Sequence, residues 1–182
     1  MTDETTTEAT EATEAAAPER AGGPLPDHPV LAAIGEAVEA ASFEISTGQH
    51  VVRVDRESLV ALVAACREHG FDTFTDLCAV DYLRRNPRFE VVVNLLNMAE
   101  PMRLRILVGV PGTDPTVPSI TGEFPGANFY EREAYDLFGI TFDGHPDLTR
   151  ILLPDDWEGH PLRKDHPVGG VPVQFKGANT VS

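Results

Sequence analysis

The sequence contains little cysteine and little positive charge. Its two cysteines, Cys66 and Cys78, form no C-x-x-C pair. Two thiols cannot by themselves supply the four thiolates of an iron–sulfur cluster, and a reducing, cytoplasmic compartment is the simplest interpretation. Lysine and arginine number 14 against 29 acidic residues, so the formal net charge is −15. Because nucleic acids and anionic membranes bind basic surfaces, this charge argues against both as partners.

Long apolar runs and glycine-rich loops are also absent. No uninterrupted apolar stretch approaches the roughly 20 residues of a membrane-spanning helix, and the acidic start differs from the basic start of a secretory signal. We therefore expect membrane association only through a partner. The sequence has no G-x-G-x-x-G after a strand, no G-x-x-x-x-G-K-[ST] and no G-x-S-x-G. It predicts no dinucleotide site, no P-loop and no hydrolase nucleophile on this chain.

The first 26 residues are of low complexity. Thr-Glu-Ala repeats three times between Thr7 and Ala15, and six acidic residues accompany Arg20, which makes the charge of this segment −5. Such a composition predicts a disordered acidic tail over residues 1–26. A solubilising role is the simplest interpretation, and attraction of a basic partner is the alternative.

Residues 27–142 predict an α+β domain. A first helix is indicated by apolar residues at helical spacing after Pro29: Val30, Leu31, Ile34, Val38 and Ala41. Residues 43–46 and 50–54 predict two short strands around a Thr47-Gly48 turn. A second helix is predicted between a cap at Asp55 and Gly70, with one apolar face: Leu59, Leu62, Val63 and Cys66. Residues 71–83 predict a loop or short helix that leads into a strand.

The strongest strand signal comes next. Apolar residues alternate through two consecutive stretches: Phe89, Val91, Val93, Leu95 and then Met102, Leu104, Ile106, Val108, Val110. Residues 97–101 join them, which predicts an antiparallel hairpin with Arg103 and Arg105 on its solvated face. Residues 111–125 predict a loop with at most one helical turn. The predicted domain is thus a pair of N-terminal helices packed on a mostly antiparallel sheet.

A short charged helix is predicted from Asn128, a suitable N-cap, to Gly139, a suitable left-handed end. At about 100° per residue, one arc is apolar: Tyr130, Ala134, Leu137 and Phe138. Arg132 and Asp136 share the opposite side, which predicts an ordinary solvated ion pair. Glu131 and Glu133 flank the apolar arc and diverge from each other, so paired-carboxylate catalysis fits poorly.

Residues 143–182 predict an extended arm. Prolines and glycines recur throughout and exclude a long helix or central strand. The arm is nevertheless too apolar for a solvated tail, because it contains Leu148, Ile151, Leu152, Leu153, Trp157 and Leu162. An extended ribbon encloses no core, so these side chains must pack on another surface, either the chain's own domain or another protein. The length of the arm favours another protein.

Three motifs follow one another in this region. They are Glu131-Arg132-Glu133-x-x-Asp136-Leu137-Phe138-Gly139-Ile140, His145-Pro146-x-Leu148-x-Arg150-Ile151-Leu152 and Trp157-x-Gly159-His160-Pro161-Leu162-Arg163-Lys164-Asp165. Together they resemble the signature of the C subunit of proton-translocating NADH–quinone oxidoreductase, respiratory complex I. The family usually has two basic residues before the Ile-Leu pair, whereas the first of these positions is Thr149 here.

The resemblance implies a non-catalytic structural subunit of the hydrophilic arm of complex I, at the cytoplasmic side of the cell membrane. It would clamp onto the large subunit that bears much of the quinone site, beside the iron–sulfur subunits. Flavin and iron–sulfur clusters would lie on those partners, and this chain would hold no cofactor. The implied interface residues are Glu131, Arg132, Glu133, Asp136, Phe138, His145, Arg150, Trp157, His160, Leu162, Arg163, Lys164 and Asp165.

Two alternatives remain open from the sequence. Related subunits occur in membrane-bound hydrogenases and in deazaflavin-linked dehydrogenases, and the three motifs do not identify the electron donor. The second alternative is a metal-dependent enzyme, because zinc-binding residue types gather in one stretch: Asp143, His145, Asp155, Asp156, His160, Asp165 and His166. Their spacing matches no H-E-x-x-H helix, and each histidine precedes a proline, which suits turns better than ligation.

Overall fold

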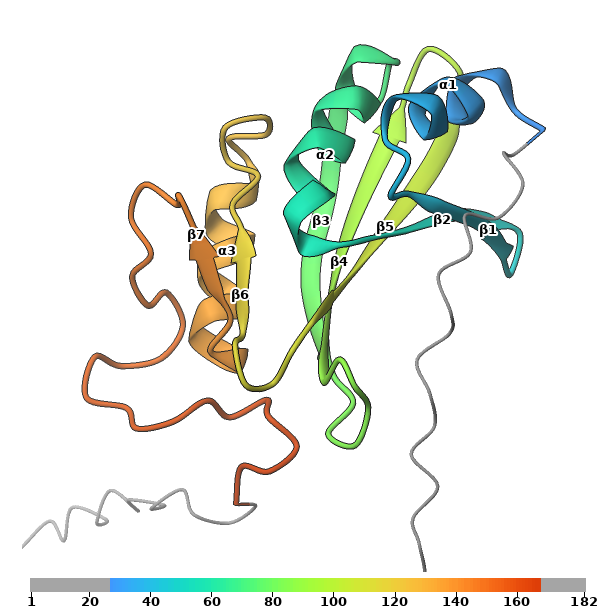
Figure 1. Ribbon diagram of the computed structural model, residues 1–182. Helices are drawn as coiled ribbons and strands as arrows, with labels where there is room; N and C mark the ends of the chain where they lie inside the picture. Colours follow the sequence, from blue (N-terminus) through green and yellow to red (C-terminus); the bar gives the residue numbers. More distant parts are fainter. Residues whose placement is uncertain (1–26, 168–182) are drawn as a thin grey trace, which may run out of the picture.

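The computed structural model describes residues 27–167, so the predicted acidic tail and the last portion of the arm, residues 168–182, lie outside it. Figure 1 shows the elements in chain order: α1 (Pro29–Ala37), β1 (Ser42–Ser46), β2 (Gln49–Val54), the 3₁₀ turn η1 (Arg56–Ser58), α2 (Leu59–Glu68), β3 (Thr73–Asp81), β4 (Phe89–Asn97), β5 (Met102–Val110), β6 (Thr116–Pro118), α3 (Ala127–Phe138) and β7 (Thr141–Asp143). No helix within this range is long and apolar enough to cross a bilayer.

The described residues form one five-stranded sheet with the order β1-β2-β5-β4-β3. All neighbours are antiparallel except β2 and β5, which run parallel. The parallel pair requires a crossover, which α2 and the β3–β4 hairpin provide. Short strands β6 and β7 pair separately beside α3. The prediction of a loop over residues 111–125 is therefore wrong for residues 116–118, which form β6. The predicted α+β class and the mostly antiparallel sheet are confirmed.

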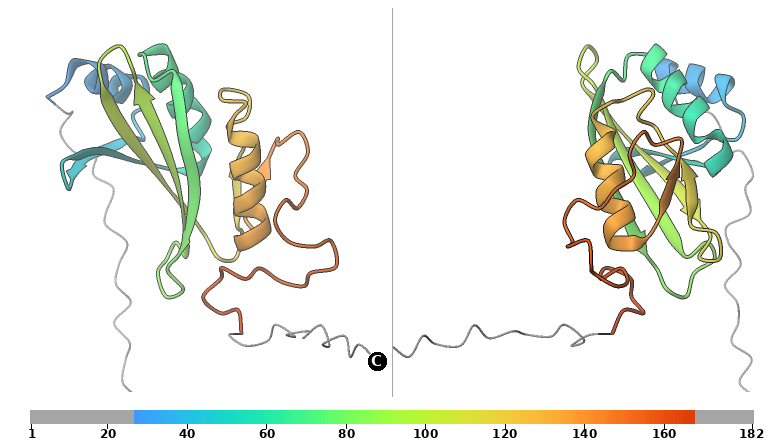
Figure 2. Two further views of the ribbon diagram at one scale, coloured as in Figure 1. Left: turned by 180° about the vertical axis from the view of Figure 1, so that it is seen from behind. Right: turned by 90° about the vertical axis from the view of Figure 1, so that its left-hand side faces the viewer.

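Both N-terminal helices cover one face of the sheet (Figures 1 and 2). The alternation of strand residues places one set toward the helices, and a row across four strands is buried there: Val52, Ile106, Val93 and Leu77. The helices contribute Leu31, Ile34, Leu62 and Cys66, none of which has measurable exposure. Cys66 is therefore a core residue, as its place on the predicted apolar face indicated.

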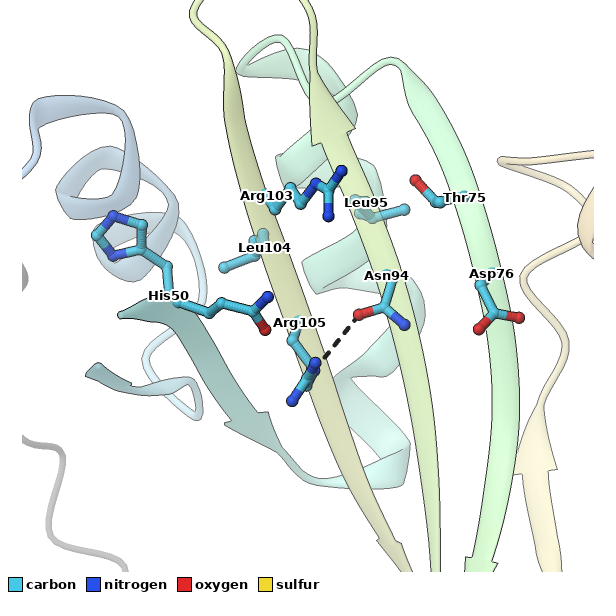
Figure 3. A pocket seen from close by; sticks show the side chains of 9 residues that line it. His50, Thr75, Asp76, Asn94, Leu95, Arg103, Leu104 and Arg105 are labelled. Carbon is cyan, nitrogen blue, oxygen red and sulfur yellow. Dashed lines mark hydrogen bonds between the residues drawn. The ribbon is translucent and has the colours of Figure 1, made fainter. Parts of the chain in front are cut away.

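The opposite face of the sheet carries a small apolar cluster, Val51, Val92 and Leu107, within a polar surround. Toward one end of this face a shallow depression is lined by His50, Asp76, Asn94, Arg103 and Arg105, as Figure 3 shows. The only hydrogen bond drawn there joins the Arg105 guanidinium to the Asn94 side chain at 3.5 Å. The side chains that line the depression do not form an acid–base pair, so the depression does not resemble a catalytic centre.

The prediction for residues 71–83 is wrong, because most of them form the edge strand β3. The apolar residues Phe71, Phe74, Leu77 and Val80 recur every third position, which favours a helix in the sequence. In the structure a register shift between Phe74 and Asp76 inserts one extra residue into the strand. The bulge breaks the period of two that identifies a strand in sequence.

Helix α3 packs along the edge strand β3, where the Phe74 and Tyr130 rings meet edge to face at 5.3 Å. The predicted cap at Asn128 is wrong, because the helix begins at Ala127 after a turn in which Ala127 N–H donates to Phe124. The predicted end is confirmed: Gly139 lies in the left-handed region with φ +69°. After β7, residues 144–167 contain no helix or strand and pass along α3 as an extended arm.

Candidate partner interface

Four donors converge on the side chain of Asp136, which is fully buried in the last turn of α3. Arg150 donates from Nη1 to Oδ1 at 3.0 Å. The backbone N–H groups of Ile151, Leu152 and Leu153 donate to Oδ2 at 3.2, 2.9 and 2.8 Å. One carboxylate therefore fixes four consecutive residues of the arm against the helix.

Asp136 is stable as a buried anion because its partners satisfy both oxygens. Burial alone would raise its pKa, but the three N–H groups and the Arg150 guanidinium together hold the pKa below its ordinary value. The expected solvated pair of Asp136 with Arg132 is wrong. Arg132 instead donates to the carbonyl oxygens of Thr149 and Arg150, each at 3.0 Å. Since this contact uses the backbone of residue 149, it does not depend on the side chain there.

Glu131 is fully buried on the side of α3 that faces the β6–α3 loop. Its carboxylate accepts the Ile120 N–H at 2.8 Å and the Ser119 hydroxyl at 2.7 Å, and burial raises its pKa. The carboxylates of Glu131 and Asp136, two of the implied interface residues, are thus both enclosed by the chain itself. Glu133, two residues along, is exposed.

The last motif closes over the end of α3. Arg163 donates from Nε to the carbonyl oxygen of Phe138 at 2.5 Å and from Nη2 to that of Gly139 at 3.3 Å. These oxygens belong to the group that a helix end leaves unpaired. A Cβ at Gly139 would lie 2.5 Å from nitrogens of both Arg163 and His160, so glycine is required there for space as well as for its φ.

Two of the three histidines of the arm bind backbone groups with their side chains, and the third takes part through its backbone N–H. His145 accepts the Asp147 N–H at Nδ1, so its proton lies on Nε2, which donates to the Asn128 carbonyl. His160 donates from Nδ1 to the Asp136 carbonyl at 2.9 Å, and the His166 N–H donates to the Arg163 carbonyl. Within residues 27–167, no three His, Cys, Asp or Glu side chains are placed to hold a metal ion.

A second carboxylate, which no sequence motif indicated, holds the far end of the arm. Asp81 at the end of β3 has no exposed side-chain surface and receives Arg88 at both oxygens, at 2.9 and 2.7 Å. It also accepts the Lys164 N–H at 2.8 Å, and Arg88 continues to Asp165 at 3.0 and 2.8 Å. The pKa values of Asp81 and Asp165 are lowered, chiefly by Arg88. We call Asp81, Asp136 and Asp165 the anchoring aspartates.

The polar contacts turn apolar side chains of the arm outward. Leu152 is 61% exposed, Leu162 is 48% exposed and Ile151 is 37% exposed, although the backbone of each is hydrogen-bonded to Asp136 or to Leu137. Phe129 of α3 is 61% exposed and lies beside Arg132, the residue that binds the arm at 149–150. We call Phe129, Ile151, Leu152 and Leu162 the exposed apolar set.

The remaining interface candidates are half-buried or exposed. Trp157 is half-buried, and its indole nitrogen is buried without an acceptor among the described residues. Phe138 packs against the core, and Lys164 is exposed. Contacts of the thirteen candidate residues with another protein stay a prediction.

Comparison with known proteins identifies the family. Residues 52–172, about two thirds of the chain, match the family described as the respiratory-chain NADH dehydrogenase 30 Kd subunit. The chain belongs to this family. Its relatives include the C subunit of the NADH-quinone oxidoreductase of Herpetosiphon aurantiacus, 50% identical over 71% of this chain and 77% of the relative.

Two further relatives are C subunits of the same kind of enzyme. The C subunit of Roseiflexus sp. is 56% identical over 59% of this chain and 62% of the relative. The C subunit of Salinispora arenicola is 44% identical over 80% of this chain and 60% of the relative. Against these two, the chain spans less than two thirds of the relative's length. Among solved structures, a trypsin-resistant fragment of Nqo5 is 36% identical with a TM-score of 0.58, covering 63% of this chain and 96% of the fragment.

A second solved chain shows that the fold is shared more widely. It belongs to a membrane-bound sulfane sulfur reductase, an archaeal respiratory membrane complex, and has a TM-score of 0.68 at 21% identity, covering 82% of this chain and 94% of that one. At this identity the likeness concerns the fold alone.

Proposed function

We propose that this chain is a structural subunit of the hydrophilic, peripheral arm of NADH–quinone oxidoreductase. In this proposal, residues 143–167 dock onto the large quinone-site subunit and brace the quinone-reducing module, on the cytoplasmic side of the membrane. Membership in the 30 Kd subunit family and relatives named as C subunits of this enzyme support a place in such a multi-subunit oxidoreductase. The chain contributes to the reaction as a member of the complex, and its own residues have no catalytic role.

The observation that carries the proposal is the combination of tight polar anchoring with outward apolar side chains. An extended arm that served only its own domain would turn its apolar residues inward. Here the buried charge of Asp136 and the donors of Arg132 hold the backbone, while Leu152 remains 61% exposed. Rigid, exposed apolar residues are typical of a preformed interface, because the segment is already ordered in the free protein and loses little entropy on binding.

In this proposal the redox cofactors lie on other subunits, because this chain has too few thiol ligands for an iron–sulfur cluster. Cys66 and Cys78 are the chain's only thiols. Cys66 lies in the core, its thiol pKa raised to about 12 by burial, and Cys78 is exposed on the sheet. Flavin and iron–sulfur clusters are accordingly assigned to neighbouring subunits. The names of the relatives support NADH as the electron donor of the assembly, and thereby complex I over the hydrogenase and deazaflavin-linked alternatives.

The test is affinity purification of the tagged full chain from its own membranes in mild detergent, followed by mass spectrometry. We expect flavin-bearing, cluster-bearing and quinone-site subunits together with NADH–quinone activity. Leu152→Asp places a charge in the exposed apolar set but keeps the backbone N–H that donates to Asp136, and should abolish this recovery. Met98→Asp makes a matching apolar-to-charged change at an exposed residue of the turn between β4 and β5, outside the predicted interface, and provides the control. Recovery of a different electron-input module would reassign the complex, and a lone wild-type chain would refute the proposal.

A further inference from the structure

The turn between β3 and β4 exposes a strained apolar residue. Leu83 has φ +53°, in the left-handed region that bulky residues rarely adopt, and its side chain is 42% exposed. Its backbone is held in place by the N–H, which donates to Asp81 at 2.7 Å. Backbone strain of this kind persists where the surroundings impose it and is concentrated at functional sites. Since Leu83 adds little to the core, its exposure calls for another explanation.

Two arginines follow Leu83 in a strongly acidic protein. Arg84 and Arg85 are exposed, and among the described residues neither pairs with a carboxylate. Arg85 is ordered nonetheless, because its guanidinium lies 3.9 Å from the centre of the Tyr82 ring. The Tyr82 hydroxyl is in turn within 3.2 Å of a Glu90 carboxylate oxygen. The net charge of the chain is −15, so unpaired positive charge at one tip is a local exception.

The turn between β3 and β4 lies next to the last described residues of the arm, and Asp81 binds both. Asp81 accepts the Leu83 N–H with one oxygen and the Lys164 N–H with the other, at 2.7 and 2.8 Å. Figures 1 and 2 show this turn and the last described residues of the arm side by side at one end of the molecule. Leu83, Arg84, Arg85 and the exposed Lys164 therefore form one surface, which we call the basic corner.

We propose that the basic corner is a second docking site, which binds an acidic surface on a neighbouring subunit of the same complex. This inference rests on the proposed function, since it requires the complex. Arginine guanidinium groups bind carboxylates in fixed, bidentate geometry, and such pairs set register and association rate. Leu83 supplies an apolar contact at the centre of the charged rim, the arrangement in which a single buried side chain anchors an interface. The bond network of Asp81 fixes the corner and the arm in one geometry, so both meet the partner together.

The first test compares two double variants with the same charge change in the tagged full chain. Arg84→Glu/Arg85→Glu alters the basic corner. Arg103→Glu/Arg105→Glu makes the same charge change on the face of the sheet opposite the helices, where, among the described residues, it removes only the 3.5 Å contact of Arg105 with Asn94. We expect the first variant to lose recovery of the complex, with association slowed about 10-fold at low salt, and with little difference left at high salt. The control should be recovered like wild type, and both isolated chains should unfold at the wild-type temperature. Equal recovery of the two variants would overturn the inference.

A second test separates docking from folding. Leu83→Asn keeps a residue that tolerates left-handed backbone but removes the apolar side chain. The isolated variant should unfold at the wild-type temperature or above it, and its recovery with the complex should fall. A photo-crosslinking residue at position 83 should then attach to an acidic segment of a subunit of the complex. Crosslinking to lipid would refute the docking role of the basic corner. Crosslinking to no subunit, while wild type is recovered with the complex, would also refute this role and leave the proposed function intact. Failure of wild type itself to co-purify would refute the proposed function.

Discussion

The side chain of Asp136 should control attachment of the arm, and Asp136→Asn is the sharpest way to show it. Asparagine keeps the shape of the side chain but replaces one accepting oxygen by a donating NH₂ group. Its amide oxygen can take the place of Oδ2 and accept the N–H groups of Ile151, Leu152 and Leu153. The NH₂ group then faces the guanidinium of Arg150, donor against donor, and Arg150, which is 23% exposed, loses its counter-charge. The variant therefore loses the hydrogen bond and ion pair with Arg150, and its three backbone hydrogen bonds end on a neutral oxygen in place of a charged one.

The magnitude follows from these contacts. A hydrogen bond to a charged group contributes about 1.5–3 kcal/mol, and removal of one partner from a buried pair costs about 3–5 kcal/mol. Because the asparagine oxygen still accepts the three N–H groups, the loss should lie at the lower end of the second range. We expect about 3 kcal/mol in the free energy of arm attachment, or ~150-fold in its equilibrium constant. The arm should detach locally while the hairpin of β4 and β5 stays folded.

The assay is native-state hydrogen exchange read at single amides. The amides of residues 151–153 donate directly to Asp136, so their protection should fall by about 100-fold, while that of β4 and β5 amides should not change. Trp157, the single tryptophan, lies on the arm and should shift its emission to longer wavelength. Glu133→Gln makes the same charge change at an exposed position of α3 and should leave both readouts unchanged. Unaltered exchange at 151–153 in Asp136→Asn would refute the reasoning, and loss of protection throughout the sheet would show that the arm is not a separate unit.

Three further predictions concern the remaining ionisable groups. Arg88→Leu leaves the buried carboxylate at the end of β3 without its guanidinium, and should cost about 3 kcal/mol by urea unfolding of the isolated chain; a loss below about 0.5 kcal/mol would mean the pair behaves as a surface ion pair. All three anchoring aspartates have lowered pKa values, so their contribution to attachment of the arm should be fully present above the ordinary carboxyl pKa of about 4 and weaken as the pH falls below it. Trp157 emission measured against pH checks this, and unchanged attachment as the pH falls well below about 4 would contradict it. Under native conditions iodoacetamide should modify the exposed Cys78 and spare the buried Cys66, with both labelled in denaturant, as counted by mass spectrometry; equal native labelling would contradict the burial of Cys66.

Local patterns in the sequence were sufficient for most of the elements. Alternating apolar residues predicted the β4–β5 hairpin, and helical spacing with Pro29 and Gly70 predicted α1 and α2, because each signal depends only on neighbours along the chain. Gly139 was identified as the end of α3 because a left-handed residue is a local requirement. The edge strand β3 was missed, since its bulge erases the period that a strand would otherwise show.

Local sequence patterns could not predict which groups bind the buried charged side chains. A helical projection assigns Asp136 to solvent beside Arg132, and nothing within one turn of the helix indicates that three N–H groups some 15 to 17 residues later will enclose it. Glu131 is likewise satisfied by Ser119 and Ile120 from the preceding loop. The sequence signal that could have pointed to both is their place in the motif shared with the family, which the helix pattern alone does not explain.

The sequence by itself determined the fold class, the family motifs and the presence of a proline-rich arm too apolar for solvent, because composition and short-range periodicity carry this information. Only the tertiary structure decided which charges are buried and which apolar residues stay exposed. The carboxylate of Asp81 meets the backbone of Lys164 across 83 positions in the chain. A buried charge is stable only where several donors converge on it, and that convergence exists in space and not along the sequence.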